Sequence, residues 1–373
     1  MLKKEIRFDC RYFDGSKPCK FKVICCGCKY YEPVKKRILI IKLASAGDVL
    51  RTTALVPALR KKYPDSHISW LVRDPGQQLL DSNPCLDRIL VFNLESVLSL
   101  LAEKFDLVIS LDKAVEALSI ATLVEARKKY GFGMNGNGKA YPFNKEAEYS
   151  FMLGLDDDLK FRKNKKTYQE MIFEIARLEY ADDRYELRLG KRELDFAERF
   201  FRANRLRKKD VVIGINTGSG KVFANKNLRP QKTVELIKLL DRQVKAKILL
   251  LGGPLEKEMN ERIFKNTGSR VIDGGCGNSL KEFSALISRC SLVITADTLS
   301  LHIAVALKRP VVALFGPTSY QEIELYKRGR KIISGLSCAP CYKNKCGKVL
   351  TCMDKISIKK IAGAARDLIA GKS

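Results

Sequence analysis

The sequence is poor in histidine and tryptophan and has no long apolar run. Only two of its 373 residues are histidine and one is tryptophan. A metal centre would therefore need other ligands, and a cysteine nucleophile would have no histidine base near it in the sequence. No window approaches the ~18 consecutive apolar residues of a membrane-spanning helix, which excludes such a helix. The N-terminal residues are basic but lack an apolar core and a cleavage site, so we expect a cytoplasmic protein without a signal peptide.

Basic residues outnumber acidic residues, 69 to 42, which gives a net charge of +27. Such a charge favours an anionic partner, and nucleic acid, an anionic membrane surface and a phosphorylated small substrate all satisfy it. The basic residues are spread over predicted helix faces without a recognisable nucleic-acid-binding module, so a solvated basic surface explains the charge equally well. The charge indicates an anionic partner without choosing one.

The twelve cysteines include two compact groups of four. In a cytoplasmic protein they favour metal ligands or small core residues over disulfides. Four thiolates within short loops match a structural zinc site, or an iron or iron–sulfur site, and any such metal would be held by cysteine alone because neither group contains a histidine. The candidate ligands are Cys10, Cys19, Cys25 and Cys28, with Cys26 as an alternative, and Cys338, Cys341, Cys346 and Cys352.

Apolar segments alternate with predicted helices along most of the chain. Continuous apolar runs such as 37–43 (RILIIKL) and 211–216 (VVIGIN) are typical of parallel strands buried on both faces. Strands that alternate with helices predict an α/β fold with doubly wound parallel sheets, and the alternation starts afresh near residue 205. We therefore expect two Rossmann-like domains. The expected strands are 37–43, 67–72, 89–92, 106–110, 211–216, 248–251, 292–295 and 311–315.

The expected domains are a cysteine-rich N-terminal module at 1–36, a Rossmann-like domain at 37–205, a second at 206–355 and a C-terminal helix at 356–373. Within the first Rossmann-like domain we expect a helix at 125–129 and a loop at 134–166. The string GFGMNG at 131–136 matches the G-x-G-x-x-G pattern of dinucleotide sites. The string comes after the expected helix rather than after a strand, and the residues that follow it do not begin another helix. We therefore do not assign it to a dinucleotide site. Ligands of such sheets bind beyond the carboxyl ends of the strands, which makes each strand-to-helix turn a candidate site.

The turn after the first strand is a candidate for catalysis. It contains Ser45, Gly47 and Asp48, and its small residues let the backbone approach a ligand. If Asp48 faces a sugar hydroxyl it can act as a general base, an effect typically worth ~10²–10⁴ in rate. The alternative is that Asp48 caps the following helix, and spacing alone favours the cap.

The second half has three turns rich in glycine, serine and threonine. Such residues at helix N-termini expose backbone N–H groups to phosphate oxygens, and a nearby lysine adds positive charge. Ordinary turns use the same residues, but three of them in one half favour a phosphate site. They are Thr217-Gly218-Ser219 before Lys226, Asp297-Thr298 before His302, and Gly316-Pro317-Thr318.

Two segments resemble the ADP-heptose:lipopolysaccharide heptosyltransferases, glycosyltransferase family 9. They read ILIIKLASAGDVLRTTALVPALRKKYPDSHISWLV at 38–72 and LVITADTLSLHIAVALKRPVVALFGPT at 292–318. The order and spacing of four motifs agree with the family: the turn ending in Gly47-Asp48, the K-x-x-x-P segment at 226–230, the D-T…H turn and the final G-P-T. The resemblance runs from about residue 37 to the C-terminal helix.

This resemblance implies a GT-B fold, in which two Rossmann-like domains face a cleft, and inverting transfer of a heptose without a catalytic cofactor. It implies that Asp48 is the general base, in an acceptor-side turn with Ser45, Gly47 and Arg51. It implies that Lys226 faces the ADP diphosphate, that Glu256 or Glu258 faces the ribose or adenine, and that Asp297 faces the donor sugar. The other implied donor-side residues are Thr217, Gly218, Ser219, Thr298, His302, Gly316 and Thr318.

The chain departs from the family pattern in two places. Leu299 stands where many members have glycine, and a leucine hinders close approach of the backbone and disfavours a positive φ. The cysteine-rich N-terminal module is absent from the better-known members. Both departures leave room for a different nucleotide-sugar or acceptor.

The sequence therefore predicts a glycosyltransferase that moves a heptose from ADP-heptose to an anionic glycolipid. The resemblance implies that the acceptor is the lipopolysaccharide inner core, reached peripherally at the cytoplasmic face of the inner membrane. One alternative is a transferase with the same donor site that acts on a protein or another glycan. The other is a non-catalytic basic protein that binds nucleic acid or a membrane.

Overall fold

The computed structural model describes residues 6–13, 15, 19–220, 224–267 and 271–371. Its contacts divide the chain into two compact units. The first comprises 1–45, 52–151 and 171–183, and the second comprises 46–51, 152–170 and 184–373. Each unit holds one six-stranded sheet. The domain limits expected from the sequence, 37–205 and 206–355, remain a prediction.

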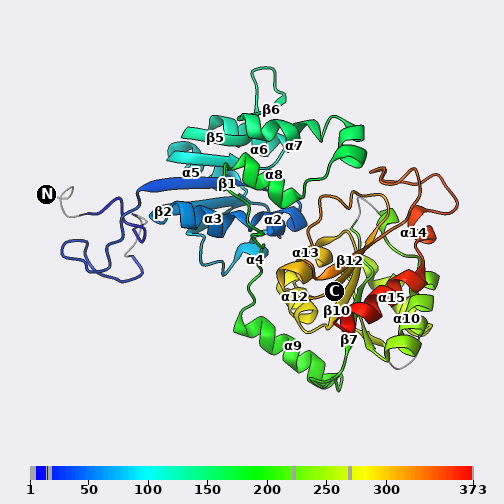
Figure 1. Cartoon of the computed structure of the whole chain (residues 1–373). Helices are drawn as coiled ribbons and strands as arrows, with labels where there is room; N and C mark the ends of the chain where they lie inside the picture. Colours follow the sequence, from blue (N-terminus) through cyan, green and yellow to red (C-terminus); the bar gives the residue numbers. More distant parts are fainter. Residues whose placement is uncertain (1–5, 14, 16–18, 221–223, 268–270, 372–373) are drawn as a thin grey trace. The chain divides into compact units, whose positions relative to one another are not determined.

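The sheet of the first unit has the strand order β3-β2-β1-β4-β5-β6 (Figure 1). All neighbouring strands run parallel except β6, which pairs antiparallel with β5. The continuous apolar run of β1 is buried from Ile38 to Ile41, as expected for a central strand of a parallel sheet. The strands are β1 (Lys36–Ile41), β2 (Ser66–Val72), β3 (Arg88–Val91), β4 (Lys104–Ser110), β5 (Glu125–Met134) and β6 (Ala140–Pro142).

The helices between these strands bury one apolar face each. Leu100 of α5 and Ala117 of α6 pack in one core with Leu39 and Val108 of the sheet. Two helices follow β1, and Pro57 lies in the first turn of the second, where its missing N–H is not needed. The helices of this region are α2 (Ala46–Thr52), α3 (Leu55–Lys62), α4 (Gln77–Leu80), α5 (Leu94–Ala102), α6 (Val115–Leu123), the 3-10 helix η1 (Lys145–Ala147), α7 (Glu148–Met152) and α8 (Tyr168–Ile175).

The sheet of the second unit is parallel throughout and has the order β12-β11-β10-β7-β8-β9 (Figure 1). Counted from the first strand of each sheet, both units have the order 3-2-1-4-5-6, which is that of dinucleotide-binding α/β folds. The strands are β7 (Val212–Asn216), β8 (Lys247–Leu251), β9 (Val271–Asp273), β10 (Leu292–Ala296), β11 (Val311–Phe315) and β12 (Gly329–Ile333). The prediction of two doubly wound sheets is confirmed.

The C-terminal helix α15 packs on α10 and on the sheet of the second unit, where Ile361 and Ala365 are fully buried beside Leu236 and Leu240. The helical elements of this unit are the π-helix η2 (Leu159–Lys163), α9 (Lys191–Ala203), the 3-10 helices η3 (Ala224–Lys226) and η4 (Pro254–Glu256), α10 (Pro230–Val244), α11 (Lys257–Lys265), α12 (Leu280–Ser288), α13 (Leu299–Ala306), α14 (Cys352–Lys355) and α15 (Ile358–Ile369).

Two sequence predictions about residues 125–166 are wrong. Residues 125–129, expected to be helical, begin strand β5, because they pair in register with β4. The GFGMNG string therefore does follow a strand, but strand β6 comes after it and no helix opens there, so it still lacks the context of a dinucleotide site. The expected loop at 134–166 contains β6, η1, α7 and η2. In the part of the chain that the structure describes, no helix is long and apolar enough to cross a membrane.

Candidate active site

In the second unit, β7 and β10 lie side by side where the strand order reverses. Open α/β sheets bind their ligands at such a point, beyond the carboxyl ends of the strands. Asn216 ends β7, and Asp297 directly follows β10. The structure therefore brings two of the expected turns, Thr217–Ser219 and Asp297-Thr298, to the same edge of one sheet.

Asn216 connects these two turns. Its side-chain amide donates to the carbonyl of Gly218 at 2.8 Å, and it lies 3.3 Å from the hydroxyls of Thr295 and Thr298. Those two hydroxyls are 3.0 Å apart. Thr298 is the extended residue just before α13, so the first N–H groups of that helix point out of the turn. Such N–H groups suit an anionic oxygen.

Lys226 and Asp297 form a half-buried ion pair at this edge. The Lys226 ammonium donates to the Asp297 carbonyl at 3.0 Å and lies 3.5 Å from the Asp297 carboxylate. Their side chains are only 14% and 16% exposed. The pair places one positive and one negative group beside the turn. The expected contacts of Lys226 with the diphosphate and of Asp297 with the donor sugar remain predictions.

His302 lies buried on α13 between an acid and a phenol. Its Nε2 is 4.0 Å from the Asp297 carboxylate, and its Nδ1 is 3.5 Å from the Tyr185 hydroxyl. Burial lowers the pKa of His302 to about 4, and the nearby Arg51 cation acts in the same direction. The imidazole is therefore neutral at neutral pH, which suits a residue that shapes the site rather than one that carries charge.

Asp48 is paired with an arginine and does not cap its helix. It is the third residue of α2, so it lies inside the helix, whereas a cap residue precedes it. Both Nε and Nη2 of Arg51 bond its Oδ1, at 3.0 and 2.8 Å. The Arg51 guanidinium in turn stacks on Tyr168 at 3.7 Å from the ring centre. A Cβ on Gly47 would lie 2.7 Å from the His302 ring, so the close approach of α2 to α13 requires glycine there.

Three carboxylates surround the Arg51 cation. Burial opposes its charge, but Asp48, Tyr168, Glu322 and Asp297 together outweigh that effect and raise the pKa of Arg51. Burial also raises the pKa of Glu322, although Arg51 acts in the opposite direction. The backbone carbonyl of Glu322 accepts a hydrogen bond from the Tyr168 N–H at 3.0 Å. The cluster therefore holds Arg51 charged and fixes the Asp48 carboxylate that it binds.

Glu256 lies close to the first donor-side turn. Its carboxylate accepts a hydrogen bond from the Gly253 N–H at 2.9 Å, and a Cβ on Gly218 would lie 3.0 Å from it. Thr217 is buried and donates to Asn260 at 2.6 Å, which anchors the turn to α11. Glu256 thus lies beside the turn, on the β8 side, and its expected contact with the ribose or adenine remains a prediction.

The G-P-T turn after β11 packs tightly against α14. A Cβ on Gly316 would lie 2.7 Å from the sulfur atoms of Cys352 and Met353, so the turn requires glycine. Thr318 is buried, and its hydroxyl has no hydrogen-bond partner among the described residues. A buried hydroxyl without a partner is costly unless a ligand supplies one.

Ser45 lies in the first unit, in the turn after β1. That turn is held by Asp112, which follows β4 and accepts from the backbone N–H groups of Leu43 and Ala44 at 3.0 and 3.1 Å. Leu299 is the first residue of α13 and does not have a positive φ. The leucine therefore introduces no backbone strain at the position where the family has glycine.

Sequence reasoning missed Tyr168, Tyr185 and Glu322, which contact or face the charged cluster, and Asn216, which joins the two turns. Only Asn216 carried a signal, because it is a polar residue at the carboxyl end of an apolar strand. The other three lie outside every motif.

All twelve cysteines are unpaired. In the C-terminal group Cys352 is buried, and its pKa is raised by burial and, more weakly, by Cys341 and Cys346, whereas Cys338 is exposed. Among the described residues, no three histidine, cysteine or carboxylate side chains are close enough together to hold a metal ion. The two expected metal sites are therefore not formed in this structure.

The sequence profile of glycosyltransferase family 9 (heptosyltransferase) matches residues 96–350. The lipopolysaccharide core heptosyltransferase OpsX of Haemophilus influenzae is 24% identical over 301 residues, which cover 76% of this chain and 80% of the relative. Lipopolysaccharide heptosyltransferase 3 of Escherichia coli K12 is 26% identical over 300 residues, which cover 74% of this chain and 80% of the relative.

Solved structures agree with the chain over about nine-tenths of its length. A glycosyl transferase of family 9 from Veillonella parvula superposes with a TM-score of 0.72 at 21% identity, covering 91% of this chain and 99% of that one. E. coli heptosyltransferase WaaC with ADP superposes with a TM-score of 0.58 at 17% identity, covering 90% of this chain and 99% of that one. The iron-containing dodecameric glycosyltransferase TibC from E. coli H10407 superposes with a TM-score of 0.53 at 11% identity, covering 91% of this chain and 77% of that one. The expected GT-B type of fold is confirmed.

Proposed function

The chain belongs to glycosyltransferase family 9, the heptosyltransferases, and from that premise we propose that it transfers a heptose from ADP-heptose to the core of a lipopolysaccharide. The observation that carries the proposal is the cluster at the reversal of strand order in the second unit. There Lys226, Asp297 and Thr298 meet beyond β7 and β10. The solved relative WaaC holds ADP, and the curated relatives are named for lipopolysaccharide.

In the proposed reaction Asp48 is the general base. Its carboxylate takes the proton of an acceptor hydroxyl as the oxygen forms a bond to the anomeric carbon of the heptose. The bond from that carbon to the diphosphate breaks on the opposite face, and ADP leaves with the electron pair, so the configuration inverts. Arg51 holds one oxygen of the Asp48 carboxylate in place, which favours a fixed orientation of the base.

The donor site uses charge and backbone N–H groups. Lys226 faces the diphosphate and stabilises the negative charge that ADP gains as it leaves. The N–H groups at the start of α13 add hydrogen bonds to the same oxygens, and Asp297 faces the heptose hydroxyls. Glu256, beside Gly218, faces the ribose. Because lysine and helix N–H groups can stabilise a leaving diphosphate, the proposed chemistry requires no metal or other cofactor.

The proposed acceptor is an anionic glycolipid. A net charge of +27 raises the local concentration of an anionic substrate and attracts the protein to an anionic membrane surface. The protein would accordingly act peripherally, at the cytoplasmic face of the inner membrane, where the sugar-nucleotide is at hand.

The test is a transfer assay with purified protein and defined substrates. ADP-heptose is supplied with lipopolysaccharide that lacks core heptose, and ADP release and heptose incorporation are measured together. Protein acceptors and heptose-bearing lipopolysaccharide are run with the same donor, and GDP- and UDP-sugars with the same acceptor. We expect equal amounts of ADP and transferred heptose on the heptose-free lipopolysaccharide. Turnover of another nucleotide-sugar, or transfer only to a protein, would refute the proposed substrates.

A further inference from the structure

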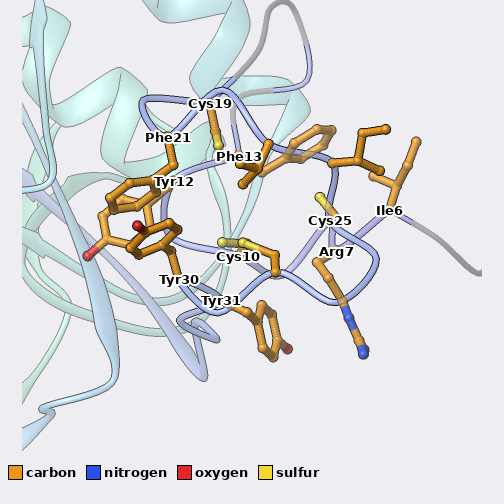
Figure 2. Close-up of a pocket in the computed structure, with 13 residues that line it drawn as sticks. Ile6, Arg7, Cys10, Tyr12, Phe13, Cys19, Phe21, Cys25, Tyr30 and Tyr31 are labelled. Carbon is orange, nitrogen blue, oxygen red and sulfur yellow. The ribbon is translucent and has the colours of Figure 1, made fainter.

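In the cysteine-rich N-terminal module (1–36), the described residues bring four cysteines to one cavity. This cavity has a volume of about 300 Å³ and is lined by Cys10, Cys19, Cys25 and Cys28 together with apolar and aromatic side chains. Figure 2 shows Cys10, Cys19 and Cys25 on different parts of the looping chain around it. Cys26 is exposed and does not line the cavity. The fold therefore selects four of the five cysteines in this module.

The module has no hydrophobic core of its own. None of its described residues is buried, and Val23 and Ile24 are 46% and 79% exposed. A segment of about thirty residues buries little apolar surface by itself, and units of this size usually depend on a metal or on disulfides. No disulfide is formed, since all these cysteines are unpaired. The module needs a cross-link that its apolar contacts do not provide.

The backbone around the cysteines is arranged in tight turns. The carbonyls of Cys10, Cys19 and Cys25 each accept a hydrogen bond from the N–H three residues later, at 3.1, 2.8 and 3.2 Å. The last of these turns ends at Cys28 and contains Gly27 with a φ of 68°, which only glycine adopts easily. The turn from Cys25 to Cys28 begins and ends on cysteine, and this two-residue spacing is common among the thiolate ligands of metal sites.

Aromatic rings and cations frame this cavity. The centre of the Phe21 ring lies 4.0 Å from that of Tyr30, on which it stacks, and 5.1 Å from that of Tyr12, which it meets edge-on. Figure 2 shows the three rings beside the cavity. The Lys20 ammonium lies 3.9 Å from the centre of the Tyr12 ring, and Arg7 lines the cavity. The cavity thus holds four thiols among aromatic and basic side chains.

The module is also tied to the first sheet. Arg11 bonds Glu32 within the module at 2.6 Å and pairs with Asp87, just before β3. Asp87 in turn accepts from the Ile68 N–H of β2 at 2.7 Å. A cross-link that fixes the turn holding Cys10 would therefore fix Arg11 and the attachment of the module to this unit.

From this arrangement we propose that Cys10, Cys19, Cys25 and Cys28 form a structural metal centre of four thiolates, which holds zinc or iron. The four side chains line one cavity but are too far apart for three of them to bind one ion as they stand. Metal binding therefore draws the thiolates together and closes the cavity. The centre folds the module and takes no part in sugar transfer.

The test uses full-length protein in which the second cysteine group is disabled by Cys338→Ser and Cys346→Ser. In this background Cys28→Ser is compared with Cys26→Ser, its neighbour outside the cavity. Zinc, iron and acid-labile sulfide are measured on protein purified without added metal. We expect about one zinc or one iron centre per chain in the background and in Cys26→Ser, and less than about a tenth of that in Cys28→Ser. Absence of metal from the background protein, or equal metal in the two variants, would overturn the proposal.

A second measurement tests the proposal even if the Cys28→Ser variant cannot be purified. Hydrogen exchange of residues 6–35 is followed in the background protein before and after a chelator, with Cys19→Ser as a second variant. Metal removal should expose the module to exchange while the sheet of the second unit stays protected. A module equally protected with and without metal would contradict the structural role. Heptose transfer by the metal-free protein tests the proposed function separately.

Discussion

The positive charge of Lys226 should govern binding of the nucleotide. Replacing it by methionine keeps most of the side-chain volume and removes the charge that lies 3.5 Å from the Asp297 carboxylate. Without the lysine, a bound diphosphate would face the Asp297 carboxylate with no cation between them. The substitution therefore removes an attraction and leaves a repulsion.

The size of this effect follows from burial of the pair. Opposite unit charges at 4 Å attract by about 4 kcal/mol when the effective dielectric constant is about 20. Removing one partner of a buried, hydrogen-bonded charge pair usually costs about 2–5 kcal/mol. The Lys226 side chain is 14% exposed, so water replaces part of the lost interaction. We therefore expect Lys226→Met to lose about 2–3 kcal/mol of binding free energy, the lower end of this range. This loss corresponds to about 30- to 150-fold weaker binding of ADP.

Calorimetric titration with ADP, in buffer with EDTA, measures this change directly. The matched control is Lys238→Met, which removes the same charge from an exposed position on α10. We expect Lys226→Met to weaken ADP binding by the stated factor and Lys238→Met to leave it within about threefold. If Lys226→Met binds ADP as the wild type does, or if both variants weaken it equally, then the lysine does not face the diphosphate.

Three further predictions concern single side chains. Because burial lowers the pKa of His302 to about 4, the unfolded chain binds a proton below about pH 6.5 that the folded chain excludes. Its contribution to the free energy of unfolding should fall by about 2 kcal/mol from pH 7 to pH 5, and urea titrations should show this part of the fall disappear in His302→Gln. Thr318→Val removes a buried hydroxyl that has no partner among the described residues. The free energy of unfolding without ligand should therefore stay unchanged or rise by up to about 1 kcal/mol, while the KM for the donor rises. An unchanged KM would exclude a contact between Thr318 and the donor. Gly131→Ala, at a φ of 92° and with a Cβ 1.9 Å from a carbonyl of β4, should destabilise the first unit by at least about 2 kcal/mol. The fluorescence of the single tryptophan reports this loss, and Gly136→Ala, where a Cβ meets nothing within 4 Å, should be neutral.

The sequence predicted the buried strands well and the exposed ones poorly. Strands β1, β7 and β11 are continuous apolar runs, because a central strand of a parallel sheet is covered on both faces. Strand β5 was mistaken for a helix because its first half, EARKK, is largely exposed and basic. Strand β12, GRKII, lies at the sheet edge and gave no signal for the same reason.

The candidate site divides in the same way. Asp48, Lys226 and Asp297 were predicted because each stands in a short motif beside a strand end or a turn. Glu322 and Tyr168 were not, because they come from segments far apart in the sequence and meet only in the folded chain, where the Tyr168 N–H bonds the Glu322 carbonyl and both residues act on Arg51. Local patterns report turns and strands, whereas the charge balance around one arginine depends on tertiary contacts.

The position of the cap could not be decided from spacing either. Asp48 follows small residues in a way that suits a helix cap, but the helix begins two residues before it, at Ala46. Helix limits shift by one or two residues with little change in sequence pattern. Asp48 therefore lies inside the first turn of the helix, where Arg51 bonds its carboxylate.

The most direct test of the account is the rate of heptose transfer by Asp48→Asn at saturating donor and acceptor. Asparagine keeps the shape of the side chain and cannot accept the proton, so we expect kcat to fall by about 10²–10⁴. Binding of ADP should stay within about threefold of the wild type, because the diphosphate is held by Lys226 and α13. Wild-type turnover by Asp48→Asn, on an acceptor that the wild type uses, would contradict the assignment of the base and with it the proposed mechanism.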